Sequence, residues 1–460
     1  MIDPLIDPES RAEALRALFG RLRFGQNAAI VGLNDVGKTT LFGLAHARPI
    51  DLDADPADRG PLTVVVDCNH LARASEPELY AVMARGLAEA AARRGETTAG
   101  RLAEAYLQRG ATGHPPAAVP AALELEAVLV RVAEQTRLTL AFLFDEFDGM
   151  YRQMAARTAL ALRAFHNRLG PALAYVVAVD QPLERIRPGV DDDDDHAGET
   201  AEFEELFVGG THLLRPLEGP AAESFVARYF RSRSVAAPDW VAPLLAELSG
   251  GHPGLLWAAC AAAQGRRFAS RAKLEQDLLD SPEVRAECEN VWKRLPAAER
   301  QAVAGQGRSA PALTIGTQAL LEGLRDRGLL RAGPAGPAAP LAIPFLAHYV
   351  AHTAHAAPVG LSVDAQTGEV SINGRPPPAP LGPTEFRLLL ALYDKAGALV
   401  TKDEIARAVW PREERLEGVD DARIDKLVDR VRAKIEPNPR APRHLVTVRG
   451  LGYRLMARQS

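Results

Sequence analysis

The chain has 460 residues, of which 25% are charged and 47% hydrophobic, and its formal net charge is −5. A single hydrophobic core stops growing near about 250–300 residues, so several domains are expected. The composition is ordinary for a folded globular protein and excludes collagen, coiled coil and bulk disorder.

Cysteine usage and the N-terminus bear on the compartment. Cys68, Cys260 and Cys288 lie far apart and form no CxxC or Cys/His ligand spacing, which favours a reducing environment. The opening MIDPLIDPES is acidic and lacks the basic start and apolar core of a signal peptide, and no run of about 18 apolar residues occurs. We therefore expect a cytoplasmic protein with no membrane partner.

Strands and helices alternate in the first half of the chain. An amphipathic helix is expected over Glu9–Leu22, leading into the apolar strand Ala28–Val31. Further strands are expected at Leu62–Val66, Leu138–Phe144 and Ala174–Val179, with helices at Glu76–Arg94 and Ala122–Glu134. This alternation predicts a parallel sheet covered by helices on both faces.

A glycine-rich loop joins the first strand to the next helix. Its sequence, Gly32-Leu33-Asn34-Asp35-Val36-Gly37-Lys38-Thr39, matches the phosphate-binding loop GxxxxGK[ST]. The glycines let backbone N–H groups turn toward phosphates, and the helix adds the positive end of its dipole. We expect Lys38 to reach the β- and γ-phosphates and the Thr39 hydroxyl to ligate Mg²⁺. The expected nucleotide contacts here are Gly32, Asn34, Asp35, Gly37, Lys38, Thr39 and Thr40.

An apolar strand carries two carboxylates at its end, in Leu140-Ala141-Phe142-Leu143-Phe144-Asp145-Glu146. We expect Asp145 to hold Mg²⁺ through water and Glu146 to orient or deprotonate a water that attacks the γ-phosphate. Together with Lys38, these two are the expected catalytic residues of an ATPase. The expected cofactors are ATP or ADP and Mg²⁺.

Residues from about 10 to 350 resemble the P-loop ATPases of the STAND and AAA+ groups, including origin-recognition-like ATPases with a trailing winged helix. By this resemblance, Asp180 occupies the place of a polar sensor of the γ-phosphate. The turn Leu248–Gly254 is similar to a glycine-rich turn that lies against the nucleotide in STAND proteins, which implies contacts from His252 and Pro253. A buried turn at a helix start is the alternative interpretation.

The sequence departs from AAA+ proteins in one respect. Phe203–Gly210 contains no arginine at the place of the arginine finger, which puts trans-activated hydrolysis in a ring in doubt. Arg185 and Arg187 lie nearby and are candidate substitutes, although we expect both to face solvent. We therefore expect a slow switch, in which ATP holds one arrangement of lid and winged helix and ADP another.

Two stretches predict surface loops, Gly110–Pro120 and the acidic run Asp191–Asp195. Cation binding is the alternative for the five aspartates. After Arg215, helices dominate to about Pro282, which predicts a helical lid.

The segment after the lid has the order of a first winged helix. Val291–Gln301 and Thr317–Leu330 are expected helices, and a hairpin is expected near Gly333–Pro340. Its basic residues Arg325, Arg327 and Arg331 are balanced by Glu322 and Asp326. We therefore expect this domain to pack against the ATPase as a relay rather than to bind DNA.

Basic charge is concentrated at the C-terminal end. From Arg423 to Arg458 there are 10 basic and 3 acidic residues, so an anionic partner is expected here. The segments Pro383–Leu392 and Val446–Leu455 resemble the winged helix of OmpR/PhoB-type response regulators, over residues 359–457. The resemblance also covers Leu399–Ile405 and Val409-Trp410-Pro411.

One helix, Asp420–Glu436, has two distinct stripes. The apolar stripe consists of Ile424, Leu427, Val428, Val431 and Ile435, and the outward basic stripe of Arg423, Lys426, Arg430 and Lys434. A basic helix face fits the major groove of DNA. The resemblance implies DNA contacts for Arg430 and Arg432, a phosphate contact for Thr447, and a minor-groove contact for Arg449. Asp425 matches an acid of the family, whereas Asp429 departs from it and would repel a phosphate.

The predicted fold is an α/β P-loop NTPase with a parallel sheet and a helical lid, followed by two winged-helix domains. The predicted boundaries are 1–215 for the ATPase core, 216–282 for the lid, 283–357 for the first winged helix and 358–460 for the DNA-binding winged helix.

The predicted function is an ATP-dependent switch that binds double-stranded DNA and regulates transcription. A homo-oligomer of the ATP form would bring two C-terminal winged-helix domains onto adjacent DNA half-sites. A protein signal is a further candidate partner. Two alternatives stay open: a DNA-remodelling or loading ATPase, and a STAND-type defence or signalling ATPase whose winged helix contacts protein. ATPase rates with and without DNA separate the first alternative from the switch.

Overall fold

The structure of the protein, a computed structural model, describes residues 5–47, 60–71, 75–111, 121–186, 197–304, 315–331, 340–352, 361–363, 368–372, 376–410, 421–436, 438–439, 442–448 and 451–456. The chain divides into two compact units. The first comprises Met1–Pro188, His196–Lys293 and Leu321–Tyr349, and the second Gly189–Asp195, Arg294–Leu320 and Val350–Ser460.

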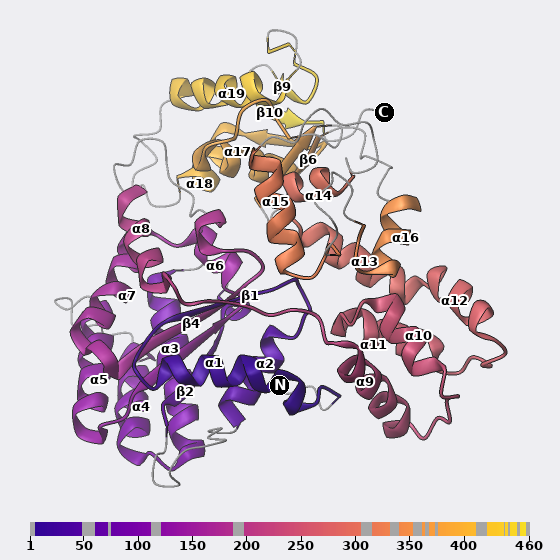
Figure 1. Ribbon diagram of the computed structural model, residues 1–460. Helices are drawn as coiled ribbons and strands as arrows, with labels where there is room; N and C mark the ends of the chain where they lie inside the picture. The colour runs from indigo at the N-terminus through magenta and orange to yellow at the C-terminus, as the bar shows by residue number, and fades with distance from the viewer. Residues whose placement is uncertain are drawn as a thin grey trace. The chain divides into compact units, whose positions relative to one another are not determined.

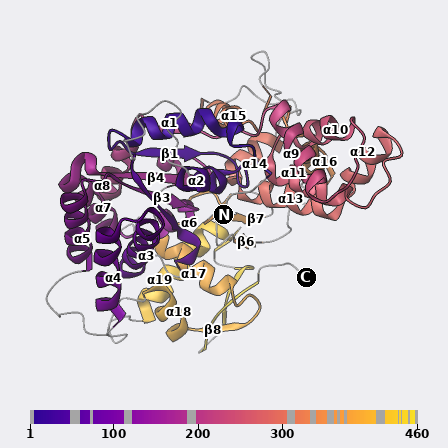
Figure 2. The same cartoon turned by 90° about the horizontal axis from the view of Figure 1, so that it is seen from below.

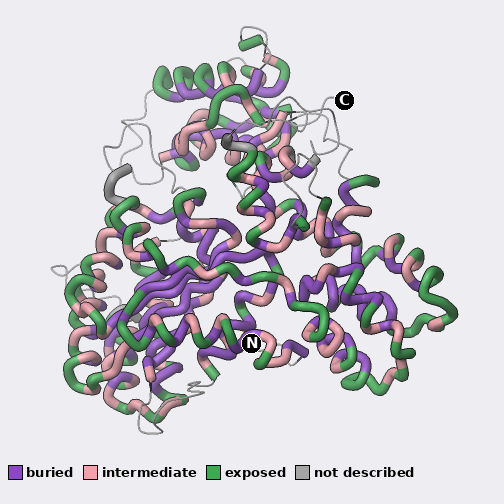
Figure 3. Tube along the Cα trace, in the orientation of Figure 1, coloured by how far each residue is buried: buried purple, intermediate pink, exposed green. Residues whose placement is uncertain are grey.

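A parallel sheet of five strands forms the centre of the first unit (Figure 1). Its strands are β1 (Ala28–Val31), β2 (Leu62–Asp67), β3 (Leu140–Asp145), β4 (Leu173–Val179) and β5 (Thr211–Leu213), in the order β2-β3-β4-β1-β5. The central strands β1, β3 and β4 are buried along their whole length (Figure 3). Continuous apolar runs of this kind suit a sheet with both faces covered, so the predicted parallel sheet is confirmed.

The helices of this core pack mainly on one large apolar cluster. Their bounds are α1 (Ala12–Leu22), α2 (Lys38–Ala47), α3 (Glu76–Arg94), α4 (Thr97–Ala111), α5 (Ala121–Thr136), α6 (Phe147–Gln153), α7 (Ala156–Leu169) and α8 (Ala197–Glu204). Short 3-10 turns occur at η1 (Pro8–Arg11), η2 (Cys68–His70), η3 (Gly170–Ala172), η4 (Leu183–Arg185) and η5 (Glu205–Phe207). The cluster joins every second residue of β1 to β4 with α3 to α8, and its aromatic members include Tyr80, Phe142, Phe165 and Tyr175.

Strand order decides which chain segments meet at the carboxyl edge of the sheet. Strand β4 lies between β3 and β1. Asp180, directly after β4, is therefore placed between the loop that leaves β1 and the carboxylates that end β3. Residues distant in sequence, 32–39, 145–146 and 180, meet at one edge, which is where open α/β sheets bind ligands.

The core differs from the prediction in small respects. The edge strand β5 is not anticipated, because three residues, Thr-His-Leu, are too short to show a pattern. Helix α4 includes Gly110 and Ala111, so the loop expected from Gly110 begins inside a helix, and its remainder, 112–120, lies outside the described residues. The aspartate run Asp191–Asp195 also lies outside them.

Between β5 and Pro282 the regular elements are helices, as predicted. They are α9 (Gly219–Ser232), α10 (Val241–Ser249), α11 (Pro253–Ala263) and α12 (Arg271–Leu279), followed by α13 (Pro282–Arg294). In the two views of Figures 1 and 2, α9 to α12 lie together, away from α3, α4 and α5.

The single helix expected over Val291–Gln301 is wrong. Helix α13 ends at Arg294, and α14 (Ala297–Ala304) begins after Pro296, whose ring has no N–H to continue a helix. Helices α15 (Ile315–Asp326) and α16 (Pro344–His352) flank an antiparallel bridge between Leu330 and Leu341. Of the hairpin predicted near Gly333–Pro340, residues 333–339 lie outside the described residues.

The C-terminal part of the second unit has a core of its own. Its elements are β6 (Leu361–Val363), β7 (Val370–Ile372), α17 (Pro383–Tyr393), β8 (Leu399–Thr401), α18 (Lys402–Val409), α19 (Asp421–Ile435), β9 (Leu445–Val448) and β10 (Gly452–Leu455). The strands form a β6-β7 pair and an antiparallel sheet of order β8-β10-β9. All five residues of the apolar stripe of α19 are buried in this core, which confirms that prediction.

The residue just before β7 contacts the first turn of α14, within the second unit. Glu369 accepts a hydrogen bond from the backbone N–H of Ala297, and its other carboxylate oxygen pairs with Arg300 Nη2 at 2.8 Å. A carboxylate at a helix N-terminus satisfies an N–H group that has no partner within the helix and opposes the positive end of the dipole.

Candidate functional site

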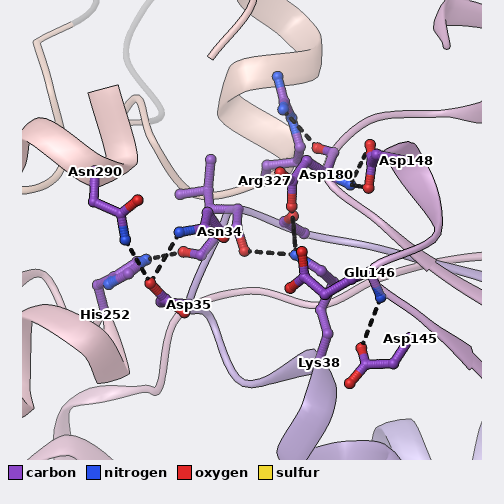
Figure 4. Close-up of polar contacts among 12 residues, drawn as sticks. Asn34, Asp35, Lys38, Asp145, Glu146, Asp148, Asp180, His252, Asn290 and Arg327 are labelled. Atoms are coloured by element: carbon purple, nitrogen blue, oxygen red, sulfur yellow. Dashed lines mark hydrogen bonds and ion pairs between the residues drawn. The ribbon is translucent and has the colours of Figure 1, made fainter. Parts of the chain in front are cut away.

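The loop between β1 and α2 surrounds its own lysine. Lys38 Nζ donates to the carbonyl oxygens of Gly32 and Leu33, each at 3.0 Å, and to Asp180 Oδ1 at 2.6 Å (Figure 4). Lys38 is 4% exposed. Burial alone would lower its pKa, but the charge and hydrogen bond of Asp180, aided by other nearby carboxylates, outweigh burial and raise the pKa of Lys38. Lys38 is therefore a fixed positive charge at the carboxyl edge of the sheet.

The backbone of this loop depends on unusual conformations. Gly37 has φ +102°, a region that side chains rarely allow, and Asp35 has φ +55°. A Cβ on Gly32 would lie 2.6 Å from the carbonyl oxygen of Leu214. Because α2 begins at Lys38, its first N–H groups have no acceptor within the helix. The loop therefore sets backbone donors and a positive dipole end beside Lys38, as a phosphate site requires.

The two carboxylates that end β3 differ in environment. Burial raises the pKa of Asp145, and a hydrogen bond from Thr39 and the charge of Lys38 offset only part of that rise. Asp145 Oδ1 also accepts from the backbone N–H of Glu146 at 3.1 Å. Glu146 is half-buried, has φ +51° and stands at the start of α6. The two predicted Mg²⁺ ligands, Thr39 and Asp145, are thus in contact.

Asp180 is held on three sides. Its carboxylate pairs with Lys38, and its backbone N–H donates to both carboxylate oxygens of Asp148 at 3.1 Å. Its carbonyl oxygen accepts from Arg327 Nη1 at 2.8 Å (Figure 4). The sequence predicts a role for Asp180 but none for Asp148, and it predicts that Arg327 is one of several balanced charges. The one signal for Asp148 is its position a helical turn after Asp145.

Asp148 is itself a buried acid, 5% exposed. Burial and the neighbouring Asp180 raise the pKa of Asp148 to about 7, while Lys38 and Arg152 oppose the rise. Arg152 Nη2 lies 4.0 Å from Asp148 Oδ1. A group with such a pKa changes its charge close to neutral pH.

A histidine of the predicted lid reaches the phosphate loop. His252 is fully buried, and its Nε2 lies 2.8 Å from the carbonyl oxygen of Asn34. That oxygen only accepts, so Nε2 carries the proton, and Nδ1 accepts from the N–H of Leu255 at the start of α11. Burial lowers the pKa of His252 to about 4, which keeps the ring neutral. The buried Pro253 occupies the first position of α11.

Other loop side chains face α11 and α13. Asp35 Oδ2 accepts from Asn34 Nδ2 and from Asn290 Nδ2, each at 2.9 Å. The N–H of Gly254 donates to the carbonyl oxygen of Asp35 at 3.3 Å. Burial and the charge of Asp35 raise the pKa of Glu287 on α13 to about 7. The side chains of Asn34 and Asp35, two predicted nucleotide contacts, are therefore engaged within the protein, and Thr40 is buried in α2.

Arg11, not anticipated from the sequence, braces the same loop from η1. Its Nη2 donates to the carbonyl oxygen of Val36 at 2.6 Å and its Nη1 to that of Arg215 at 2.8 Å. Burial lowers the pKa of Arg11 to about 10. An arginine in an amphipathic helix usually faces solvent, so no local pattern marks it. Of the two candidate finger arginines, Arg185 is exposed and Arg187 lies outside the described residues.

The basic residues predicted on α19 fall into two groups. Arg423, Lys426 and Arg430 are exposed. The guanidinium of Arg423 lies over the ring of Trp410, 4.6 Å from its centroid. Lys434 is only 23% exposed and pairs at 2.5 Å with Glu385, which is buried on α17.

Arg432 is engaged with the last hairpin. Its Nε and Nη2 both donate to the carbonyl oxygen of Leu445, at 3.0 and 2.9 Å, and Nη2 also donates to Thr447 Oγ1 at 2.7 Å. Thr447 is exposed on β9, and Arg449 lies outside the described residues. Asp429 is exposed and lies 3.5 Å from Arg432 Nη1.

The carboxylate of Asp425 is bonded to side chains within the C-terminal domain. It accepts from the hydroxyl of Tyr453 on β10 at 2.6 Å and pairs with Lys402 Nζ at 2.7 Å. These hydrogen bonds lower the pKa of Asp425. The presence of an acid at this position of α19 is thus explained by the packing of α19 against α18 and the hairpin.

Known proteins support the assignment of this last domain. Residues 376–455 match the family model "Transcriptional regulatory protein, C terminal". The C-terminal domain is a winged helix of the OmpR/PhoB type. It is 42% identical over 101 residues to the sensory transduction protein RegX3 of Mycolicibacterium smegmatis, and 38% identical over 96 residues to the transcriptional regulatory protein AfsQ1 of Streptomyces coelicolor. These matches cover 22% and 21% of the chain, and the chain spans about two fifths of the relatives' length, 41% and 40%.

Two solved structures align with a larger share of the chain, at low identity. The Walker-type ATPase PABY2304 of Pyrococcus abyssi aligns with 74% of the chain and 95% of its own, at 17% identity and a TM-score of 0.47. The ORC2 protein of Aeropyrum pernix, in its ADPNP-ADP complexes, aligns with 73% of the chain and 90% of its own, at 15% identity and a TM-score of 0.38. The first unit itself has a parallel five-stranded sheet with a GxxxxGK[ST] loop directly after β1. Among the described helices, none is both long and apolar enough to cross a membrane.

Proposed function

We propose that this protein is an ATP-controlled switch that binds double-stranded DNA through its C-terminal winged helix and regulates transcription. The observation that carries the proposal is the joining, in one chain, of a buried Lys38 site at the edge of a P-loop sheet and a basic α19 in an OmpR/PhoB-type domain. The first supplies an input and the second an output.

The residues of the nucleotide site fit a triphosphate with magnesium. Lys38 and the N-terminus of α2 supply the positive groups that phosphates need, and Thr39 with Asp145 supply hard oxygen ligands in contact with each other. Bound magnesium would neutralise phosphate charge. Asp145 would hold that ion, and Glu146, which stands beside it, would orient a water or take its proton.

The lid residue His252 would report on the shape of the phosphate loop. Its neutral ring is tied to the carbonyl oxygen of Asn34, and Gly254 to that of Asp35. A change in the loop backbone on nucleotide binding would alter these two hydrogen bonds. The switch would therefore act through the contact between loop and lid, with hydrolysis as a slow timer.

The three exposed basic residues of α19 are the DNA contacts that this proposal favours. Arg423, Lys426 and Arg430 carry positive charge on the outward face of the helix that reads the major groove in winged-helix proteins of this type. Arg432 and Lys434 have internal partners, so they would support the helix, and a direct DNA contact by either would require those partners to be exchanged.

The test measures DNA binding in ATP, ADP and no nucleotide across a salt series. The probe is a fluorescent pool of random-sequence duplexes at low ionic strength, which needs no knowledge of the recognised sequence. We expect binding that weakens steeply with salt and differs between ATP and ADP. Binding that is identical in all three conditions would overturn the switch, and no binding at low salt would overturn the DNA-reading function.

A further inference from the structure

Asp180 connects three parts of the first unit that are far apart in sequence. Its side chain meets Lys38 of the phosphate loop, its N–H meets Asp148 of α6, and its carbonyl oxygen meets Arg327, which follows α15 (Figure 4). The site chemistry accounts for the first contact. The third joins the nucleotide site to a segment beyond the lid, and the proposed function does not use it.

Arg327 is buried to an unusual degree for an arginine. It is 2% exposed, and its Nε donates to the carbonyl oxygen of Gly323, one turn back in α15, at 3.2 Å. A guanidinium removed from water is costly unless its donors find acceptors. Asp180 supplies one of those acceptors with a backbone oxygen, so the contact constrains the main chain of Asp180.

The end of α15 is fixed against the same edge of the sheet by neighbouring contacts. Arg215, just after β5, donates through Nε to the carbonyl oxygen of Asp326 at 2.8 Å. Gly328 has φ +80° and packs so that a Cβ would lie 2.8 Å from the Pro216 side chain. Three successive residues, 326 to 328, therefore dock beside the strand ends that carry the nucleotide site.

We propose that Arg327 is a positioning residue, which sets Asp180 and thereby the preference of the Lys38 site for a triphosphate over a diphosphate. The argument rests on the proposed nucleotide function. The Asp180 carboxylate competes with phosphate oxygens for the Lys38 ammonium, and a γ-phosphate brings extra negative charge to this edge. A shift of the Asp180 main chain changes that competition for the triphosphate more than for the diphosphate.

The coupling runs in both directions. If docking of residues 326 to 328 changes the affinity for ATP relative to ADP, the bound nucleotide changes the stability of that docking by the same factor. Arg327 thus makes the segment after α15 sensitive to the γ-phosphate.

The test compares nucleotide affinities of full-length variants. Dissociation constants for a fluorescent non-hydrolysable ATP analogue and for fluorescent ADP are measured for the wild type, Arg327→Met, Arg327→Lys and Arg331→Met. Arg331 is an exposed arginine four residues away and serves as the matched control. We expect Arg327→Met to change the ATP-to-ADP affinity ratio about fivefold or more, a size typical of coupling between sites. Arg327→Lys, which keeps a donor and a charge, should restore part of the ratio, and Arg331→Met should leave it unchanged.

The outcomes distinguish this inference from the proposed function. Thermal melting establishes which variants fold. If Arg327→Met does not fold, the nucleotide affinities of Arg327→Lys are used for the test. A folded variant with both affinities reduced equally, or with a ratio within twofold of the wild type, overturns the role of Arg327 and leaves the nucleotide function standing. A wild type that binds neither nucleotide overturns both.

Discussion

Charged side chains at the proposed nucleotide site and on helix α19 lie in opposite environments. Lys38, Asp148 and Arg327 are each 5% exposed or less, and their partners come from segments distant in sequence. Arg423 and Arg430 are exposed on one helix. A buried charge acts through fixed geometry in a medium of low polarity, whereas an exposed charge acts through long-range attraction that salt screens. The first arrangement suits recognition of one small ligand, and the second suits docking on a long polyanion.

The largest expected effect is at Lys38. Lys38→Ala removes the ammonium group and leaves Asp180 without its ion-pair partner. We expect ATP affinity to fall by about 100-fold or more, equivalent to about 2.7 kcal/mol, with the DNA affinity measured without nucleotide unchanged. Titration with a fluorescent ATP analogue checks the first, and Lys273→Ala, an exposed lysine of the lid, is the control. Normal ATP binding by Lys38→Ala would remove the basis for the nucleotide site.

Arg430 tests the exposed side of the comparison. Arg430→Ala should weaken duplex binding by about 2 kcal/mol, or roughly 30-fold, and should leave folding stability unchanged, because the side chain is exposed. Duplex titration at two salt concentrations measures this, with Arg271→Ala, an exposed arginine of α12, as the control. Equal duplex affinity of Arg430→Ala and wild type would exclude α19 as the reading helix.

Arg432 sharpens the distinction between buried and exposed charges. It lies next to the exposed basic face of α19, but its guanidinium is hydrogen-bonded within the domain. Arg432→Ala leaves the carbonyl of Leu445 without two donors, so we expect the C-terminal domain to lose about 1.5 kcal/mol of stability. Urea unfolding followed by Trp410 fluorescence measures this, in a chain whose Trp240, Trp257 and Trp292 are replaced by phenylalanine. A variant as stable as the wild type, but defective in DNA binding, would move Arg432 into the reading surface.

The smallest expected effect concerns pH at the buried site. The raised pKa of Asp148 means that the folded state holds a proton between about pH 4 and 7 that the unfolded state has released. Asp148 therefore lowers the free energy of unfolding as the pH rises through that window. The charged groups that face it are Asp180, Lys38 and Arg152. Asp148→Asn lacks the titration, so its stability relative to the wild type should rise as the pH increases from 4.5 to 7. Urea unfolding of both proteins at pH 4.5 and 7 measures this. A difference in unfolding free energy that is the same at the two pH values would contradict the prediction.

Sequence alone located the features that local pattern encodes. The loop from Gly32 to Thr39, the helix Glu76–Arg94 and the buried stripe of α19 each follow from spacing within one element. Local pattern does not reveal the roles of Asp148, Arg327 and Arg11, because their partners lie 32, 147 and 25 positions away. Periodicity predicts that Lys434 faces outward with Arg423, Lys426 and Arg430, but its ammonium pairs instead with the buried Glu385 of another helix.

The hydrogen bond from Ala297 to Glu369 bears on how the protein should be dissected. A fragment trimmed to the stretch that matches the regulator family, 376–455, would discard Glu369 and leave the N-terminus of α14 unsatisfied in whatever piece retained that helix. If limited digestion cuts the chain after α16, Ala297 and Glu369 end up in different fragments, and their hydrogen bond would hold those fragments together. A fragment that begins ahead of Ala297 keeps this hydrogen bond, but it also removes Leu321–Tyr349 from the first unit, so no single cut in the chain separates the two units.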